Sequence, residues 1–136
     1  MYLSRLETVA LYASANLLIL LVLAYLVSAT RRAHKISLGD GGNEHLTRAM
    51  RAHANAAEYI PGGLIGLVLA ALLEPAFPTW LMHAAGLSLT IGRISHGYGM
   101  HQAGVPMSRR VGTGLTWACY LMLAIGLAYG ALAQRL

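Results

Sequence analysis

The sequence predicts an all-α fold, an integral membrane four-helix bundle, from three observations. Of the 136 residues, 57% are hydrophobic and only 11% are charged, whereas a soluble domain carries about 25% charged residues. Two uncharged runs, 9–30 and 111–134, are each long enough to cross a hydrocarbon core of about 30 Å. The charged residues gather between the apolar runs. We therefore expect one membrane domain over residues 1–136.

The first helix is expected over about residues 4–31. Its uncharged run is longer than the apolar region of about 7–15 residues in a secretory signal, so we expect a retained membrane helix. Asn16 is the one strongly polar side chain in this run, and we expect it to form an interhelical hydrogen bond. Arg31 and Arg32 follow the run, which suits the negative end of a helix dipole.

The second helix is expected over about residues 44–73, with Asn43 as its N-cap. Five polar residues recur here at spacings of 4, 3, 4 and 3, which places them on one helix face. They are Glu44, Arg48, Arg51, Asn55 and Glu58. Charged groups on a membrane helix are costly unless they face a partner or a polar cavity. This stripe is therefore the first candidate for a binding site.

The third and fourth helices are expected over about residues 79–102 and 109–134. Arg93 and His96 are three residues apart near the end of the third helix, so they share a face. Arg109 and Arg110 precede the fourth apolar run. Only Arg5 and Arg135 fall on the opposite side of the predicted bundle. The positive-inside rule then predicts that both termini lie on the non-cytoplasmic side.

The composition excludes several other classes of function. The net charge of +5 is not accompanied by a nucleic-acid motif, so we expect no nucleic-acid partner. Cys119 is the only cysteine and the histidines lack metal-ligand spacing, so we expect no metal site. A channel or transporter is disfavoured because the polar residues cluster at one end of the predicted bundle instead of following a path across it.

The clustered arginines suit a small zwitterion, since arginine binds carboxylates bidentately and Glu58 can accept an ammonium group. The alternative is a structural network in which these charges pair with one another. Arg51 and Glu58 are two turns apart, about 10 Å along one helix, which is too far for a direct pair. That spacing favours a ligand or a partner helix, and both readings stay open on the residues alone.

The segment Arg51-Ala-His53-x-Asn55-x-x-Glu58-Tyr59-x-Pro61 resembles the signature of the MAPEG family, the membrane-associated proteins of eicosanoid and glutathione metabolism. Gly92-Arg93-x-x-His96 and the basic third connector resemble the family more loosely. The resemblance covers nearly the whole chain and is nearest to the bacterial inner-membrane branch. It implies a homotrimer of multi-pass protomers in the inner (cytoplasmic) membrane, with glutathione as a cosubstrate bound between subunits at the cytoplasmic end.

The resemblance also implies roles for individual residues and a set of partners. The glutathione-binding residues would be Arg51, Asn55, Glu58 and Tyr59, with Arg48, Arg31, His96 and Arg93 as further candidates. Arg109 would be the catalytic residue that activates the thiol, with Arg110 as the alternative. The other partners would be membrane lipids and a small lipophilic substrate.

The implied function is a glutathione-dependent transferase or peroxidase that acts on lipophilic electrophiles or lipid hydroperoxides. The sequence departs from active relatives at Ala54, where some carry a second arginine, and at Met100, where an aromatic residue is usual. These departures motivate the alternative of a non-catalytic membrane protein that binds a lipid or peptide in the same pocket.

Overall fold

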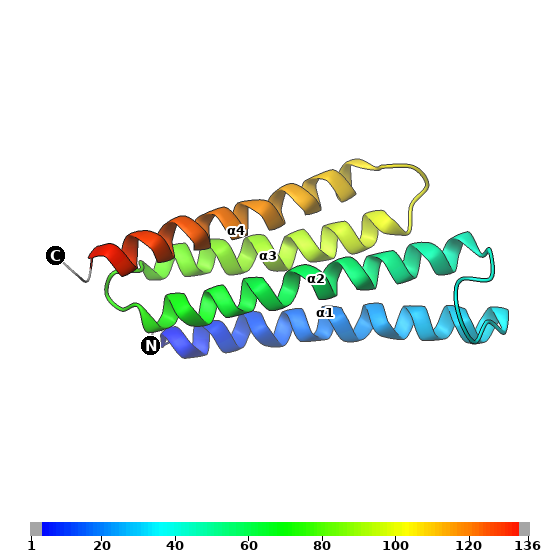
Figure 1. Ribbon diagram of the computed structural model, residues 1–136, viewed down its shortest axis with the longest axis horizontal. Coiled ribbons are helices and arrows are strands. Elements are labelled where there is room, and N and C mark those ends of the chain that lie inside the picture. Colours follow the sequence, from blue (N-terminus) through cyan, green and yellow to red (C-terminus); the bar gives the residue numbers. More distant parts are fainter. Residues whose placement is uncertain (1–3, 134–136) are drawn as a thin grey trace.

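The computed structural model describes residues 4–133, which form four helices joined by short connectors. The helices are α1 (Arg5–His34), α2 (Glu44–Leu72), α3 (Thr79–Met100) and α4 (Met107–Ala133). They lie side by side and run alternately in opposite directions (Figure 1). The start of α1 and the end of α4 share one end of the bundle, and the α1–α2 and α3–α4 connectors share the other. The predicted all-α fold is confirmed.

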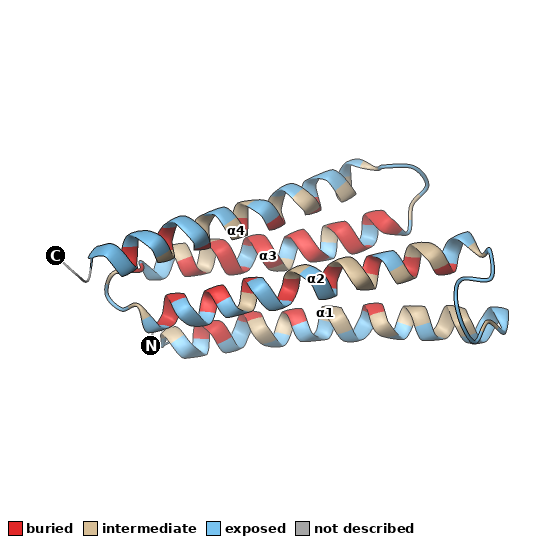
Figure 2. Cartoon of the chain, viewed as in Figure 1, coloured by how far each residue is buried: buried red, intermediate tan, exposed pale blue. Residues whose placement is uncertain are grey.

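The distribution of apolar side chains is that of a membrane protein. Among the described helices, α1, α2 and α4 are long and apolar enough to cross a membrane. Large apolar side chains such as Leu21, Leu121 and Ile125 are exposed, as expected where hydrocarbon is the solvent. In Figure 2 the buried positions are most frequent on α3 and α2, whereas α1 and α4 are mostly exposed or half-exposed. Arg93 and His96 lower the hydropathy of α3, and both are buried inside the bundle.

The helix ends differ from the predicted ones by a few residues. Helix α1 continues to His34 instead of ending near residue 31, because Lys35 is the first residue to leave the helix, with φ of 54°. Helix α3 ends at Met100 instead of 102. Helix α4 begins at Met107, directly after Pro106, whose carbonyl accepts from the N–H of Arg109 at 3.1 Å. Its predicted last residue, 134, lies outside the described residues.

Polar groups on the helices bond across helix contacts, as expected in lipid. The Asn16 side chain donates to Thr90 Oγ1 on α3 at 2.9 Å, which confirms its predicted interhelical bond. The Ser88 hydroxyl of α3 donates to the carbonyl of Leu115 on α4 at 2.7 Å. These bonds join α3 to α1 and to α4.

The connector between α1 and α2 is organised by Asp40. Its carboxylate accepts from the Gly42 N–H at 3.1 Å and from the Thr47 hydroxyl at 2.8 Å. The Gly42 amide, followed by the Thr47 hydroxyl, holds the pKa of Asp40 below its usual value. The carboxylate therefore stabilises the connector at neutral pH, and its contribution is lost only as the pH falls through that lowered pKa. The predicted N-cap is confirmed next to it, because Asn43 Oδ1 accepts from the Leu46 N–H at 2.9 Å.

Arg5 stabilises the opposite end of the bundle. Its guanidinium donates to the carbonyl of Ala70 at 2.6 Å, of Ala71 at 3.2 Å and of Phe77 at 2.7 Å. It thus satisfies two carbonyls that the end of α2 leaves unpaired and one in the α2–α3 connector. We expect Arg5→Met to lower the free energy of unfolding by about 1–3 kcal/mol, as for hydrogen bonds to a charged group. Thermal unfolding in detergent measures this effect, and an unchanged midpoint relative to Arg32→Met, at an exposed position of α1, would contradict it.

Candidate functional site

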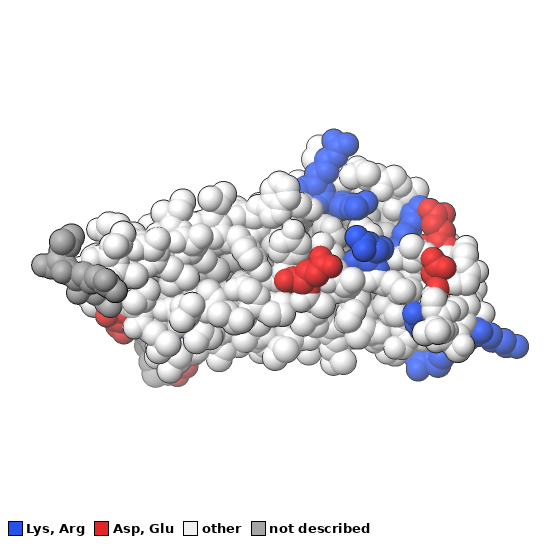
Figure 3. Space-filling view, viewed as in Figure 1, with Lys and Arg blue, Asp and Glu red and all other residues white. Residues whose placement is uncertain are grey.

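Most of the basic side chains gather at the end of the bundle that holds the connectors 35–43 and 101–106, which we name the basic end. Figure 3 shows Lys and Arg grouped there on the visible face, with acidic side chains among them. Arg5 is the described cation at the other end, and it is bonded to carbonyl groups. All the predicted site residues lie on elements of the basic half.

The polar stripe of α2 divides into two groups. Arg48 donates a hydrogen bond to the α3–α4 connector, and Asn55 accepts one from α3. Arg51 and Glu58 remain exposed. Within residues 4–133, the only ion pair is between Arg48 and Glu44, so neither Arg51 nor Glu58 has an ionic partner in the described protomer. On this face of α2, Arg48 and Asn55 are therefore held by hydrogen bonds within the protomer, whereas the charges of Arg51 and Glu58 are exposed and can bind a ligand or a partner.

Arg93 joins three helices from a fully enclosed position, with 2% of its surface exposed. Its Nη1 donates to Asn55 Oδ1 on α2 at 2.7 Å. Its Nε and Nη2 donate to Thr116 Oγ1 on α4 at 2.9 and 2.6 Å, and Nη2 also approaches the Gly112 carbonyl at 3.3 Å. Its Cζ lies 5.3 Å from the centre of the Tyr59 ring. Within the described protomer these contacts fix the guanidinium and hold the amide oxygen of Asn55, while the predicted role of Arg93 in ligand binding stays a prediction.

The orientation of Asn55 has a chemical consequence. Because its amide oxygen accepts from Arg93, its NH₂ group is left to donate to an acceptor. Tyr59 lies one turn further along α2, and its carbonyl accepts from the hydroxyl of Tyr120 on α4 at 2.7 Å. The two tyrosine rings meet edge to face, with centres 5.8 Å apart. Tyr59, Tyr120 and Trp117 line a cavity of about 430 Å³ on this side of the bundle.

Arg48 connects α2 to the α3–α4 connector. Its guanidinium donates to the Gln102 carbonyl at 2.6 Å and pairs with Glu44 one turn earlier on α2. Both of its interactions are therefore used within the protomer. Arg48 supports the position of the third connector, which carries the chain toward Arg109.

Arg109 and Arg110 begin α4 and line one cavity of about 370 Å³ with Thr113 and Trp117. Arg109 is half-buried and Arg110 is exposed. Arg109 precedes Thr116 by seven residues, so the two share one face of α4. That face carries the groups that bond Arg93 and Tyr59, whereas Arg110 is rotated by about 100° from Arg109. Arg109 therefore begins on the face of α4 that bonds Arg93 and Tyr59, and Arg110 lies beside it in the same cavity.

His96 and Arg31 lie apart from the exposed charges of α2. His96 is buried where α3 meets Gly112 of α4. Arg31 donates to the Gly39 carbonyl at 2.8 Å and to the sulfur of Met50 at 3.4 Å. Around α2, Met50 is rotated by about 100° from Arg51 and about 80° from Glu58. Within one protomer Arg31 is therefore held beside the face that carries Arg51 and Glu58, and not on it.

Two residues that the sequence did not single out complete the site. Thr116 and the carbonyl of Gly112 are the α4 acceptors for Arg93. A signal was present, because Thr116 is one of few polar residues in an otherwise apolar run. A buried arginine requires such acceptors.

The fold and the polar end together define a multi-pass α-helical membrane protein with a polar site at one end. The sequence model of the MAPEG family matches residues 9–129. The chain belongs to the MAPEG family, as its helix-two motif indicated. It is 37% identical to the inner membrane protein YecN of Escherichia coli strain K12 over 117 residues. The aligned segment covers 85% of this chain and 86% of the relative. The YecN protein of E. coli O6:H1 strain CFT073 gives the same values.

These relationships and the three helices apolar enough to cross a membrane confirm the predicted localisation, an integral multi-pass protein of the inner membrane. The name of the E. coli relative states a location and no activity.

Proposed function

We propose that the protein binds glutathione at its basic end and uses it as a glutathione-dependent transferase or peroxidase. The substrates would be lipophilic electrophiles or lipid hydroperoxides that enter from the bilayer. The observation that carries this proposal is the pair Arg51 and Glu58, exposed and without an ionic partner in the described protomer. Glutathione offers carboxylates to an arginine and an ammonium group to a glutamate. Its peptide carbonyls fit the free NH₂ of Asn55.

The site is completed by a second copy in this proposal. Arg31 is held against Met50, beside the face that carries Arg51 and Glu58, and we assign it to the glutathione molecule bound at a neighbouring subunit. A homotrimer places such a neighbour against each exposed α2 face. Both termini would lie on the non-cytoplasmic side, since the cations of the basic end would face the cytoplasm.

The chemistry requires a thiolate near neutral pH. A free thiol has a pKa near 8.5, so it is mostly protonated at pH 7. Lowering that pKa by two units takes about 2.7 kcal/mol of preferential thiolate stabilisation. A guanidinium in a partly dry site supplies energy of this order, and Arg109 is the residue we assign to it. In the transferase reaction the thiolate would form a C–S bond to the electrophilic carbon, with loss of the leaving group or addition to the double bond. In the peroxidase reaction it would attack the outer peroxide oxygen and break the O–O bond, which gives the lipid alcohol and a glutathione sulfenic acid that a second glutathione converts to the disulfide and water.

The binding proposal is tested by calorimetric titration of glutathione into the purified protein. We expect Glu58→Gln and Arg51→Ala each to weaken binding by about 10- to 100-fold, as for one charge-assisted hydrogen bond of about 1.5–3 kcal/mol. The matched controls Glu74→Gln and Arg32→Ala change exposed charges elsewhere in the chain and should bind normally. Equal affinity in all four variants would show that the α2 stripe does not hold glutathione.

Arg109→Ala separates thiol activation from binding. We expect glutathione to remain bound while the pH at which its thiolate forms rises by about two units, toward the pKa of the free thiol. Activity at pH 7 should then fall by about 100-fold, and raising the pH should restore part of it. The measurement is thiolate absorbance against pH, with Arg110→Ala as the control. If Arg110→Ala moves the titration and Arg109→Ala does not, the assignment is reversed.

A non-catalytic binding protein is the second candidate, favoured by the position of Met100. This residue stands where an aromatic residue is expected and is buried in the contact between α1, α2 and α3, so it offers nothing to a reacting thiol. Glutathione binding without turnover of either substrate class would support this candidate. Turnover that is lost in Arg109→Ala would exclude it.

A further inference from the structure

The contact between α1 and α3 is tight in one half of the bundle and open in the other. Near the chain termini, Gly86 brings the α3 backbone against the ring of Tyr12, where an added Cβ would lie 2.6 Å from Cε2. Asn16 and Thr90 bond across the same contact. Toward the basic end, an added Cβ at Gly97 would meet only Leu23, whose Cδ2 lies 3.4 Å away. The two helices therefore leave a cavity between them in the basic half.

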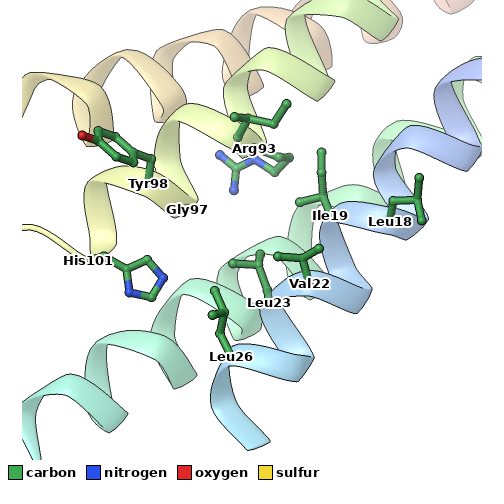
Figure 4. Close-up of a pocket in the computed structure, with 10 residues that line it drawn as sticks. Leu18, Ile19, Val22, Leu23, Leu26, Arg93, Gly97, Tyr98 and His101 are labelled. Carbon is green, nitrogen blue, oxygen red and sulfur yellow. The ribbon is translucent and has the colours of Figure 1, made fainter. Parts of the chain in front are cut away.

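This cavity has a volume of about 330 Å³, and we name it the α1–α3 groove (Figure 4). Its α1 wall consists of leucine, isoleucine and valine side chains, which include Leu18 and Val22. Both are exposed on the outside of the bundle, so the groove opens sideways onto the surface that faces lipid. The α3 wall contains Gly97 and Tyr98, and His101 lies at its basic end. In Figure 4, Arg93 extends from α3 toward the same space.

We propose that the α1–α3 groove binds one acyl chain of an anionic phospholipid, with its headgroup at the basic end. The shape and apolar walls suit a hydrocarbon chain that enters from the bilayer. Tyr98 and His101 have an apolar body and a polar tip, which suits the level of the headgroups. The charge argument comes from the basic end of the bundle, where Lys and Arg side chains gather (Figure 3) and attract an anionic headgroup. Arg93 and His101 are the basic residues in the lining of the groove itself.

A second apolar cavity serves as an internal comparison. It has a volume of about 470 Å³ and lies between α3 and α4, lined by residues that include Leu81, Leu121 and Ile125. Its lining contains no Lys, Arg or His, and it lies toward the chain termini. A cavity that is apolar but lacks nearby cations should accept hydrocarbon without preference for an anionic headgroup.

The groove also lies against the candidate site. Arg93 of α3 contributes to the lining of the groove, and its guanidinium also donates to Asn55 on α2. An acyl chain in the groove would therefore pack against the side chain that orients Asn55. The binding of the lipid itself does not depend on the proposed binding of glutathione.

The test uses the full protein in phosphatidylcholine vesicles that contain a trace of phosphatidylglycerol with a photoreactive acyl chain. After illumination, cross-linked peptides are measured by mass spectrometry. We expect segments 18–26 and 94–101 to be labelled more than segment 121–129. Excess unlabelled phosphatidylglycerol should displace the probe from the groove, and excess phosphatidylcholine should not.

Two pairs of variants make the test specific. Gly97→Leu fills the groove and should reduce labelling there by about tenfold, because several methylene contacts are lost. Gly97→Ala is the matched control, since its Cβ fits at 3.4 Å from Leu23. His101→Glu leaves the groove open and should remove the preference for phosphatidylglycerol, whereas His101→Gln should retain most of it. Even labelling of both cavities, equal competition by the two lipids, or full labelling of a folded Gly97→Leu protein would overturn the proposal.

Discussion

Gly112→Ala will strongly destabilise the protein, because the α3–α4 contact has no room for a methyl group. The added Cβ would overlap the backbone nitrogen of His96 and lie 2.6 Å from the carbonyl oxygen of Gly92. Both neighbours are backbone atoms, so no side chain can rotate away. Relief would require α3 and α4 to separate, which also moves the Gly112 carbonyl away from Arg93. We expect a loss of about 2–3 kcal/mol or more in the free energy of unfolding.

The matched control lies two residues further along the same helix. An alanine at Gly114 would meet no atom within 4 Å, so Gly114→Ala should be neutral or stabilising by up to about 1 kcal/mol through helix propensity. Thermal unfolding of both variants in detergent measures the difference. Equal midpoints for the two would show that the helices do not approach as closely as described.

Arg93→Lys will weaken glutathione binding by about 10- to 100-fold although the positive charge is retained. A guanidinium can donate at once to Asn55, Thr116 and the Gly112 carbonyl, whereas an ammonium group lacks this planar fork. Asn55 would then lose the bond that fixes its amide. The expected size follows from losing one well-oriented ligand hydrogen bond and part of the surrounding network.

The effect of Arg93 should be one of positioning and not of thiol activation. In Arg93→Lys, the pH at which bound glutathione forms its thiolate should therefore stay as in the unmodified protein, whereas Arg109→Ala shifts it. Thr116→Val removes one acceptor of Arg93 with little change in shape and should give a smaller loss of affinity in the same direction. A thiolate titration shifted by Arg93→Lys would contradict the positioning role.

Much of the fold could be predicted from local properties of the sequence. The helices were predictable because uncharged runs and a clear N-cap depend on neighbouring residues alone. The ends of the helices were less predictable, since α1 continues through Arg31 and Arg32 until Lys35 adopts a left-handed conformation. Hydropathy misses α3 as a membrane helix because Arg93 and His96 count as polar although the other helices enclose them.

The candidate site was only partly predictable for a related reason. Helical spacing correctly placed Arg51 and Glu58 on one face of α2, but it could not show that Asn55 turns into the bundle. That depends on Arg93 and Thr116, which come from other helices and meet only in three dimensions. The position of Arg31 was also not predictable from helical spacing, because its contact with Met50 depends on how α1 packs against α2.

The most direct test of the central claim is a titration of the purified protein with glutathione at pH 7, followed by thiolate absorbance. We expect a thiolate signal that saturates with added glutathione, persists in Gly114→Ala and disappears in Arg109→Ala. S-methylglutathione should compete for the site without producing the signal. The absence of any saturable binding at millimolar glutathione would contradict the proposal that the basic end is a glutathione site.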